Sequence, residues 1–323
     1  MSKVKKLIRR PEFSGILFAS PWFIGFLVLG LFPIAASLFY SLSRYNVVRP
    51  PTFIGTANYQ MLFQDTFFWR SLWNTFYLLI FGLPLQLLTA FLLALLLNSS
   101  IRGKGFFRTV FYLPAILPIV ATAILWLWIL NPRYGLINSF PAMSATMILR
   151  YLGPILPAFI ERFFLGLLDF RGPGWLADPN WSKPGLILMN LWLTGTTMVI
   201  FLAALQQVPK HLYEAAMIDG ANDFRKILYV TIPSIKPVIL FNTVMGVIAT
   251  FQYFTQVYVM TTDPASGQLA GGPEYSTLVY PLYLYQNAFQ FFRMGYASAM
   301  AWIMFLIIGI CIWGIFKIYG REV

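Results

Sequence analysis

The stretch YEAAMIDGANDFRKILYVTIPSIKP, residues 213–237, decides how this chain is organised. It lies in a polar interlude, residues 206–237, between two apolar runs that are each long enough to cross a bilayer. Pro209 suits the first turn of a helix, because its missing N–H would have no intrahelical partner there. Gly220 can end that helix, because glycine readily adopts positive φ. The sequence therefore predicts a short helix from Pro209 to Gly220.

A second short helix is predicted directly after the first. Asn222 has the side chain of an N-terminal cap, and the apolar residues that follow recur at helical spacing and form one stripe: Phe224, Ile227, Leu228 and Ile232. Pro233 and Pro237 are expected to stop this helix. The interlude therefore reads as two short helices with a hinge between them.

The composition is that of a membrane protein. Hydrophobic residues make up 59% of the chain, charged residues only 11%, and the mean hydropathy is +0.70. Runs of roughly 20 apolar residues, enough to span about 30 Å of hydrocarbon, lie near residues 15–42, 74–97, 106–130, 185–205, 238–260 and 295–318. We expect an all-α integral membrane protein with six transmembrane helices, and short extracytoplasmic helices near 58–68.

Lysine and arginine predict the orientation, because basic residues near short loops are retained on the cytoplasmic side. They gather in the N-terminus, the second loop, the polar interlude and the tail: Lys3, Lys5, Lys6, Arg9, Arg10, Arg102, Lys104, Arg108, Lys210, Arg225, Lys226, Lys236, Lys317 and Arg321. Both termini and residues 206–237 are therefore expected in the cytoplasm. The net charge of +12 follows from this sidedness and from contact with anionic membrane lipid, and we expect no nucleic-acid partner.

The N-terminal region, residues 1–14, is expected to be a basic cytoplasmic segment. A basic start followed by an apolar run could also be a cleavable signal peptide, but this run is too long for one, and Pro33 interrupts it before the small residues Ala35 and Ala36. An uncleaved first helix is the preferred interpretation.

Catalytic motifs are absent from the sequence. There is no phosphate-binding GxxxxGK[ST] loop, no HExxH and no nucleophile elbow. Cys311 lies in an apolar run, and His211, at the start of the first predicted short helix, is expected to be a solvated surface residue rather than a ligand. One residue of each kind cannot form a catalytic triad or a cysteine metal site. We expect no catalysis, no bound metal and no cofactor on this chain itself.

The polar interlude and seven further segments resemble segments of a known protein family. These seven are FIGTANYQMLF (53–63), FWRSLWNT (68–75), FFRTVFYLPAILP (106–118), NPRYGLIN (131–138), GGPEYST (271–277), YLYQNAF (283–289) and MGYASAMAW (294–302), with MVIFLAALQQVPKHLYEAAMIDGA (198–221) leading into the interlude. In this order the chain resembles the permease subunits of bacterial ABC importers, the binding-protein-dependent inner-membrane components, of the carbohydrate-uptake type similar to maltose and glycerol-phosphate permeases.

The resemblance implies a type I permease fold over residues 15–323, a single domain in the bacterial inner membrane. It implies a second permease subunit, expected as a heterodimer, two cytoplasmic ATPase subunits that bind ATP and Mg, and an extracytoplasmic solute-binding protein. Residues 206–237 would be the loop that docks on an ATPase, called the EAA loop below. Its docking residues would be Glu214, Ala215, Ala216, Asp219, Gly220 and Pro233.

One segment departs from the family pattern. Such permeases usually have a short connection after Asn138, whereas here residues 139–171 intervene before GPGWLADPNW (172–181). Charged residues and prolines interrupt its apolar run, so an interfacial or re-entrant helix is expected rather than a seventh span. A packing insert without a role in binding is the preferred interpretation.

The substrate path is predicted from polar residues inside the spans, because such side chains normally face a bundle interior or water. On a helical wheel of the fifth span, one face carries Asn242, Gln252, Tyr253 and Gln256, and the fourth span carries Asn190, Thr194 and Thr197. Amides, hydroxyls and an aromatic ring suit an uncharged sugar. The same residues could instead join helices to one another, and that role is preferred for Gln86 in the second span.

The expected function is therefore sugar import as one permease subunit of an ATP-driven transporter. The alternatives are import of another solute such as glycerol phosphate, or a secondary transporter that works alone. Secondary transporters typically carry charged residues or broken helices at mid-membrane, and these apolar runs hold almost no charge. An integral-membrane enzyme would need a catalytic cluster that the sequence lacks.

Overall fold

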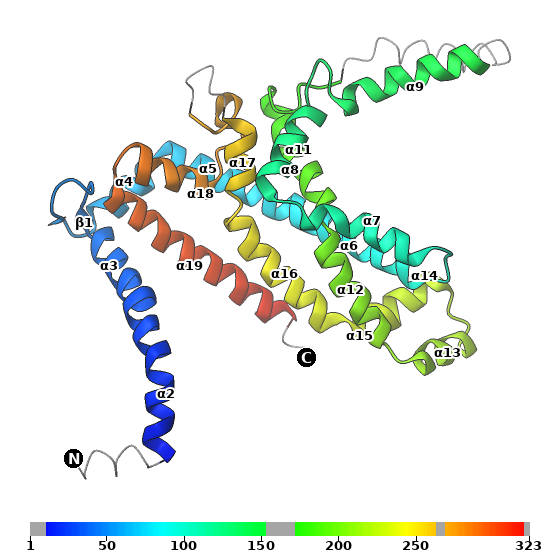
Figure 1. The fold of residues 1–323 in the computed structure, drawn as a ribbon, viewed down its shortest axis with the longest axis horizontal. Helices are drawn as coiled ribbons and strands as arrows, with labels where there is room; N and C mark the ends of the chain where they lie inside the picture. Colours follow the sequence, from blue (N-terminus) through cyan, green and yellow to red (C-terminus); the bar gives the residue numbers. More distant parts are fainter. Residues whose placement is uncertain (1–10, 153–171, 263–268, 320–323) are drawn as a thin grey trace. The chain divides into compact units, whose positions relative to one another are not determined.

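The computed structural model describes residues 11–152, 172–262 and 269–319 (Figure 1). The basic residues Lys3 to Arg10, residues 153–171 of the predicted insert and the tail residue Arg321 lie outside the described residues. The chain falls into two compact units, one of residues up to Asp65 with 284–306, the other of residues 66–283 with 307 onward. Each unit is described by itself, and the single domain expected over residues 15–323 stays a prediction.

The first unit begins with the first predicted span. α2 (Pro11–Gly25), a π-helical turn (Phe26–Leu31) and α3 (Phe32–Ser41) follow one another, and the window Phe18–Ser41 is long and apolar enough to cross a membrane. Its side chains are largely exposed, as expected of a helix that faces lipid or another subunit.

A small hairpin and a short helix follow this span. β1 (Ser43–Arg44) pairs antiparallel with β2 (Thr52–Phe53), with Ser43 opposite Phe53, and α4 (Ala57–Gln64) comes next. The buried Asn58 side chain donates to the carbonyl oxygens of Ser41 (2.8 Å) and Ser43 (2.9 Å). This amide therefore fixes α4 against the start of the hairpin.

The N-terminal half of α19 (Met294–Tyr319), the predicted sixth span, completes the first unit. Its backbone approaches the hairpin closely: the Gly295 N–H donates to the Tyr45 carbonyl (3.0 Å), and a Cβ on Gly295 would stand 2.1 Å from the Ser43 carbonyl oxygen. Only glycine fits at this contact.

The second unit contains the other predicted spans. The second is α5 (Thr66–Tyr77), a π-helical turn (Leu78–Gly82) and α6 (Leu83–Asn98), one continuous helix over Thr66–Asn98. It therefore begins earlier than the predicted 74–97, and only α4 is a separate short helix in the region near 58–68. The remaining helices are α7 (Lys104–Ile116), α8 (Ile119–Ile129), α9 (Leu136–Leu152), α11 (Pro179–Trp192), α12 (Gly195–Gln207), α13 (Lys210–Ile218), α14 (Asp223–Lys226), α15 (Ile232–Ser234), α16 (Lys236–Phe251), α17 (Thr255–Thr261) and α18 (Tyr280–Tyr285).

Three of the predicted spans are not straight helices. Among the described residues three helices could cross a membrane alone, and up to six spans result if each bent pair counts as one. The pairs are α7 with α8, bent by 102°, α11 with α12, bent by 48°, and residues 223–234 with α16, bent by 71°. The first of these breaks lies at Leu117–Pro118. Leu117 has extended backbone, because the residue before a proline avoids the helical conformation and proline cannot continue the preceding helix.

The predicted fifth span, 238–260, is also interrupted. α16 ends at Phe251, and the chain resumes helical structure only at Thr255 in α17. A helical wheel drawn through this segment is therefore wrong, because the residues beyond Phe251 no longer share the rotation of those before it.

Three of the π-helical turns precede a proline by two residues. The turns Phe26–Leu31, Leu78–Gly82 and Ile227–Thr231 are followed by Pro33, Pro84 and Pro233. A proline lacks the N–H that would bond to the carbonyl four residues earlier, and its ring clashes with that carbonyl. A wider turn accommodates both effects without ending the helix.

The predicted insert begins as a helix. α9 covers Leu136–Leu152, starting three residues before the expected boundary, and carries Pro141 inside it and Arg150 in its last turn. It is not among the candidate spans of the described residues.

A polar network fixes the helices that line the site described below. Asn74 of α5 donates to the carbonyl oxygens of Tyr275 (2.9 Å) and Leu278 (3.0 Å), and its own carbonyl oxygen accepts from Lys183 of α11 (3.2 Å). Hydrogen bonds between membrane helices each contribute up to about 1–2 kcal/mol, so this amide holds α5 and α11 in register.

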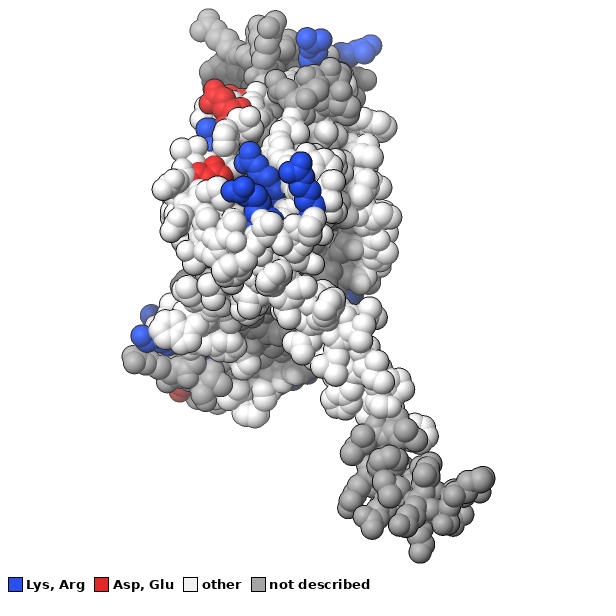
Figure 2. All heavy atoms as spheres, turned by 90° about the vertical axis from the view of Figure 1, so that its left-hand side faces the viewer, with Lys and Arg blue, Asp and Glu red and all other residues white. Residues whose placement is uncertain are grey.

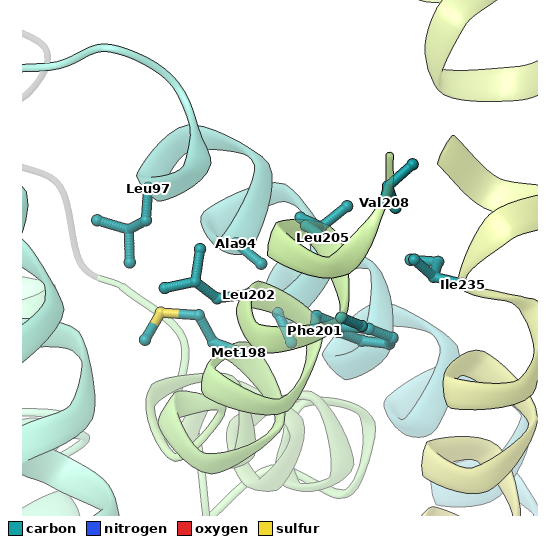
Figure 3. Close-up of a cluster of buried hydrophobic side chains, with 10 residues drawn as sticks. Ala94, Leu97, Met198, Phe201, Leu202, Leu205, Val208 and Ile235 are labelled. Atoms are coloured by element: carbon teal, nitrogen blue, oxygen red, sulfur yellow. The ribbon is translucent and has the colours of Figure 1, made fainter. Parts of the chain in front are cut away.

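A buried hydrophobic cluster of the second unit lies between α6 and α12 (Figure 3). It is built from Ala90, Ala94 and Leu97 of α6, Met198, Phe201, Leu202, Ala204 and Leu205 of α12, then Val208 and Ile235. The last two residues lie near the two ends of the EAA loop, so both ends of the loop are anchored in one packed cluster.

Candidate functional site

The first helix of the EAA loop is α13, Lys210–Ile218, with Pro209 at its N-cap. It ends as predicted at Gly220, which has φ +76°. The Gly220 N–H donates to the Met217 carbonyl (3.1 Å) and the Ala221 N–H to the Ala216 carbonyl (2.9 Å). These are the two hydrogen bonds of a Schellman ending, which requires positive φ at the glycine position.

The predicted docking residues lie together on this loop and face outward. Glu214, Ala215, Asp219, Gly220 and Pro233 are exposed, and Ala216 is half-buried. Within the described part of the chain no ion pair involves Glu214. His211 is also exposed, in agreement with the prediction of a solvated residue.

The loop also exposes large apolar side chains that the prediction did not include. Ile218 is 87% exposed and Met217 54%, on the last turn of α13. They directly precede Asp219 in the sequence. Their position among the predicted docking residues could therefore have identified them as further docking residues. Exposed apolar groups clustered on a surface mark a contact with another molecule.

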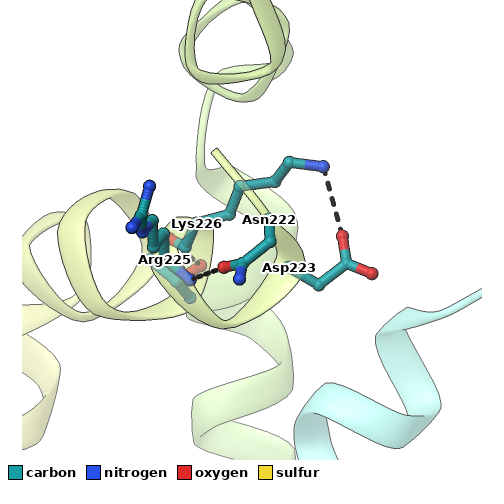
Figure 4. Close-up of polar contacts among 5 residues, drawn as sticks. Asn222, Asp223, Arg225 and Lys226 are labelled. Carbon is teal, nitrogen blue, oxygen red and sulfur yellow. Dashed lines mark hydrogen bonds and ion pairs between the residues drawn. The ribbon is translucent and has the colours of Figure 1, made fainter. Parts of the chain in front are cut away.

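The second helix of the loop starts at Asn222, as predicted. The Asn222 side-chain oxygen accepts from the Arg225 N–H (2.9 Å), and Lys226 forms an ion pair with Asp223 (3.2 Å; Figure 4). The helix then continues through the π-helical turn into α15, so Pro233 does not stop it. Phe224 is 71% exposed, so its side chain does not pack on this subunit's own helices.

The loop is held to the unit through Tyr213. Its hydroxyl lies 3.0 Å from the Thr231 hydroxyl, and Thr231 is buried and donates to the Lys226 carbonyl (3.3 Å). The Tyr213 side chain also packs on the cluster of Figure 3. The two short helices of the loop are thus joined to each other and to the α6–α12 cluster.

A polar cavity of about 150 Å³ lies in the same unit, where α16 ends. Four of the seven predicted substrate-path residues line it, Asn190, Gln252, Tyr253 and Gln256. Gln86, which was predicted to join helices, lines it too. The other residues are Leu78, Gly82, Leu83, Ile187, Gly246, Ala249 and Thr250.

The break between α16 and α17 and the π-helical turn Leu78–Gly82 both border the cavity. Irregular backbone inside a membrane is tolerated where it lines a cavity, and π-helical turns are frequent at functional sites. The irregular backbone is therefore a second indication, independent of the side chains, that this cavity is a functional site.

The other three predicted residues do not reach the cavity. Asn242 is buried and its amide donates to the Val238 carbonyl of its own helix (2.9 Å). Thr194 is buried at the start of α12 and donates to the Leu191 carbonyl (2.9 Å), and Thr197 lies half-buried in α12. The wheel grouped Asn242 with Tyr253 only because it assumed one unbroken helix.

Tyr253 is the most unusual residue of the cavity. Its side chain is 6% exposed, and its hydroxyl is buried without a hydrogen-bond partner in the described structure. A buried polar group left unpaired costs about 1–3 kcal/mol, and buried hydroxyls in native proteins are nearly always paired. The hydroxyl is therefore available to a ligand.

The cavity offers neutral recognition chemistry. The cavity residues supply four amides, two hydroxyls and an aromatic ring, with no charged side chain. No group of three or more His, Cys, Asp or Glu side chains that could hold a metal occurs in the described part of the chain. The arrangement can bind hydroxyl groups reversibly.

Comparison with known proteins agrees with the loop and the spans. Residues 86–323 match the family of the binding-protein-dependent transport system inner membrane component. The chain belongs to this family. The matched residues include the EAA loop and nine of the twelve cavity residues, and begin after the β1–β2 hairpin.

Relatives and solved structures extend the similarity over the whole permease. The chain is 38% identical over 98% of its length to the "Probable ABC transporter permease protein YesP" of Bacillus subtilis, and the match covers 93% of that protein. It is 33% identical over 94% of its length to the lactose transport system permease protein LacF of Rhizobium radiobacter, covering 93% of it. A chain of a bacterial alginate ABC transporter crystallised with a periplasmic protein has the same fold, with a TM-score of 0.74, 23% identity and 98% of both chains covered.

Proposed function

We propose that this permease is one of two membrane subunits of an ATP-driven importer for a neutral sugar. The observation that carries the proposal is the buried, unpaired Tyr253 hydroxyl in a cavity lined by uncharged polar groups. A sugar hydroxyl would supply the missing hydrogen bond, and the tyrosine ring offers an apolar face to sugar C–H groups.

The absence of charge in this lining favours a neutral sugar over glycerol phosphate. A phosphate needs basic side chains or helix N-termini as partners, and the described cavity residues include no basic side chain. The relative that transports lactose supports the same substrate class.

The cavity is too small to be a complete site. Small-molecule sites usually enclose roughly 300–1,000 Å³, against about 150 Å³ here. We propose that the second permease subunit, in a heterodimer, supplies the remaining half.

Two ATPase subunits would bind the EAA loops of the two permeases from the cytoplasm, and ATP and Mg would be bound by those subunits. Glu214 and Asp219 would meet basic groups of an ATPase, Ala215 and Ala216 would permit close approach, and Ile218 would fill an apolar pocket. An extracytoplasmic solute-binding protein would deliver the sugar. Both termini would lie in the cytoplasm of a bacterial cell, with the chain in the inner membrane.

α16 offers a direct path for coupling. It begins beside the EAA loop at Lys236 and ends at Phe251, next to Gln252 and Tyr253 of the cavity. A helix is a stiff element, so a displacement of the loop by the ATPase would reach the cavity through this one helix.

The test uses the complete complex, assembled from this chain and the transport proteins encoded beside it and reconstituted in vesicles. ATP-dependent uptake of labelled sugars is measured for the wild type, Tyr253→Phe and the matched control Tyr112→Phe, which lies outside the cavity. Losing one hydrogen bond to the sugar should raise the KM for uptake about three- to tenfold, since such bonds contribute about 0.5–1.5 kcal/mol. Tyr112→Phe should behave as wild type.

The yield of assembled complex separates substrate contact from helix packing. The Tyr253 hydroxyl has no protein partner to lose, so Tyr253→Phe should assemble at least as well as wild type. A lower yield with unchanged KM would assign the residue to helix packing and contradict the proposed substrate contact.

A further inference from the structure

A second and larger cavity lies in the first unit and is lined by basic residues. It measures about 750 Å³ and is bordered by the β1–β2 hairpin, α4 and the start of α19. Its polar lining residues are Arg44, Tyr45, Asn46, Arg49, Thr52, Asn58, Asp65, Arg293 and Tyr296. Figure 2 shows basic side chains gathered on this face of the molecule.

The charges of the cavity are unbalanced. Arg44, Arg49 and Arg293 are exposed, and none of them takes part in an ion pair within the described residues. The one acidic lining residue is Asp65, which already accepts a hydrogen bond of 2.6 Å from the Tyr296 hydroxyl. The N-terminus of the 26-residue helix α19, directly after Arg293, adds a partial positive charge.

The cavity is held in shape by buried contacts. Asn58 bonds the start of the hairpin, and Gly295 lets the α19 backbone touch it, as described above. Phe292, which lines the cavity (φ +54°), and Val47, in the loop between the lining residues Asn46 and Arg49 (φ +67°), have backbone conformations that are costly for such side chains. Strain of this kind persists where the surroundings hold it and is common at functional sites.

The position in the chain sets which side the cavity faces. The hairpin directly follows the first span, and α19 carries the last span away from it. In the proposed topology this end is extracytoplasmic, where arginines are not retained by the positive-inside tendency. The positive-inside tendency therefore does not account for the three arginines, which form no ion pair with any described residue.

We infer that this arginine cavity receives acidic side chains of the solute-binding protein. Guanidinium groups pair bidentately with carboxylates. An exposed ion pair with a small acid would contribute almost nothing, because water and salt screen it, whereas a docked protein covers all three arginines and removes that screening. This inference rests on the proposed function, since it presumes an importer served by a binding protein.

The test measures association of the cognate solute-binding protein with the assembled complex in lipid nanodiscs. The variant is R44Q/R49Q/R293Q, and the matched control is Arg133→Gln, an exposed arginine between the third and fourth spans that lies outside the cavity. Steering by charge raises association rates at least about tenfold and is lost at high salt. The triple variant should associate about tenfold more slowly at low salt and show a flatter salt dependence, and Arg133→Gln should match the wild type.

Several outcomes would overturn the inference. The triple variant could associate at the wild-type rate with the wild-type salt dependence. The arginines could instead bind glucuronate in the absence of binding protein, or retain anionic lipid from mixed vesicles, in each case without affecting association. If the triple variant does not assemble, the three single variants are measured instead, and each should show part of the loss.

The same experiment distinguishes this inference from the proposed function. A wild-type complex that takes up sugar with binding protein and ATP upholds the importer, whatever the triple variant does. A wild-type complex that neither binds the protein nor transports sugar would remove the proposed function itself.

Discussion

Glu214 is the residue on which the proposed docking depends most directly. It is exposed on α13, and Ala215 beside it presents no bulk that could hold a partner away. Reversal of one charge at a covered interface leaves two like charges without water, which typically weakens association by several kcal/mol. We therefore expect Glu214→Lys to leave the subunit inserted and folded, and to reduce ATPase activity stimulated by binding protein at least about tenfold.

Glu214→Gln is the matched variant, because it keeps the size of the side chain and removes only the charge. It should fall between the wild type and Glu214→Lys, both in co-purification of the ATPase subunits and in stimulated ATP hydrolysis. Full co-purification and full stimulation in Glu214→Lys would contradict the docking role of this helix.

Residues whose chemistry is local were predictable from the sequence. Gly220 ends α13 with positive φ and Asn222 caps α14, since glycine at a helix end and asparagine at a helix start each act within one turn of chain. Tyr253 was predicted as a substrate-path residue, but its unpaired hydroxyl was not predictable. Whether this hydroxyl has a hydrogen-bond partner depends on how the neighbouring helices pack, which the sequence alone does not show.

At the scale of the helix, the sequence predicts the positions of the apolar runs well, but it predicts poorly where the helices bend or are interrupted. The first, second and last spans are continuous, whereas the other apolar runs are bent or interrupted. Pro118 could have signalled the bend before α8, but neither proline nor glycine occurs at Gln252–Phe254, where α16 ends. The break there is a tertiary effect, and it explains why Asn242 was wrongly grouped with Tyr253.

The contact between α7 and α12 depends on one glycine. A Cβ on Gly195 would lie 2.6 Å from the Phe111 carbonyl oxygen and 2.9 Å from the Tyr112 Cα, so the α12 backbone would have to move. Overpacking of this kind costs about 1–3 kcal/mol. We expect Gly195→Ala to lower the temperature at which the detergent-solubilised complex unfolds.

Gly105 in α7 provides the control, because a Cβ there meets nothing within 4 Å. Gly105→Ala should leave the unfolding temperature unchanged or raise it slightly, since alanine favours helix over glycine by about 1 kcal/mol. Equal unfolding temperatures for the two alanine variants would show that α12 does not pack on α7 in this way.

At the scale of the whole molecule, the proposed mechanism depends on the side of the membrane that each loop faces. The proposed six crossings would place both termini and the EAA loop on one side, and the β1–β2 hairpin on the other. A crossing by the region that includes α9 would move the EAA loop to the outside, where no ATPase could reach it. The arginine cavity would keep its side, because it follows the first span.

Single cysteines test this arrangement once the only native cysteine, Cys311 in α19, has been replaced by alanine. Lys210→Cys and Arg225→Cys in the EAA loop should react with a membrane-impermeant thiol reagent only after the cells are opened. Val48→Cys, at a side chain 84% exposed, and Arg133→Cys should react in intact cells whose outer barrier is permeable to the reagent. The contradicting result would be labelling of both position 48 and position 225 in intact cells. The hairpin and the EAA loop would then lie on the same side of the membrane, with an even number of crossings between them instead of the proposed three. An ATPase in the cytoplasm could not dock on Glu214 in that arrangement.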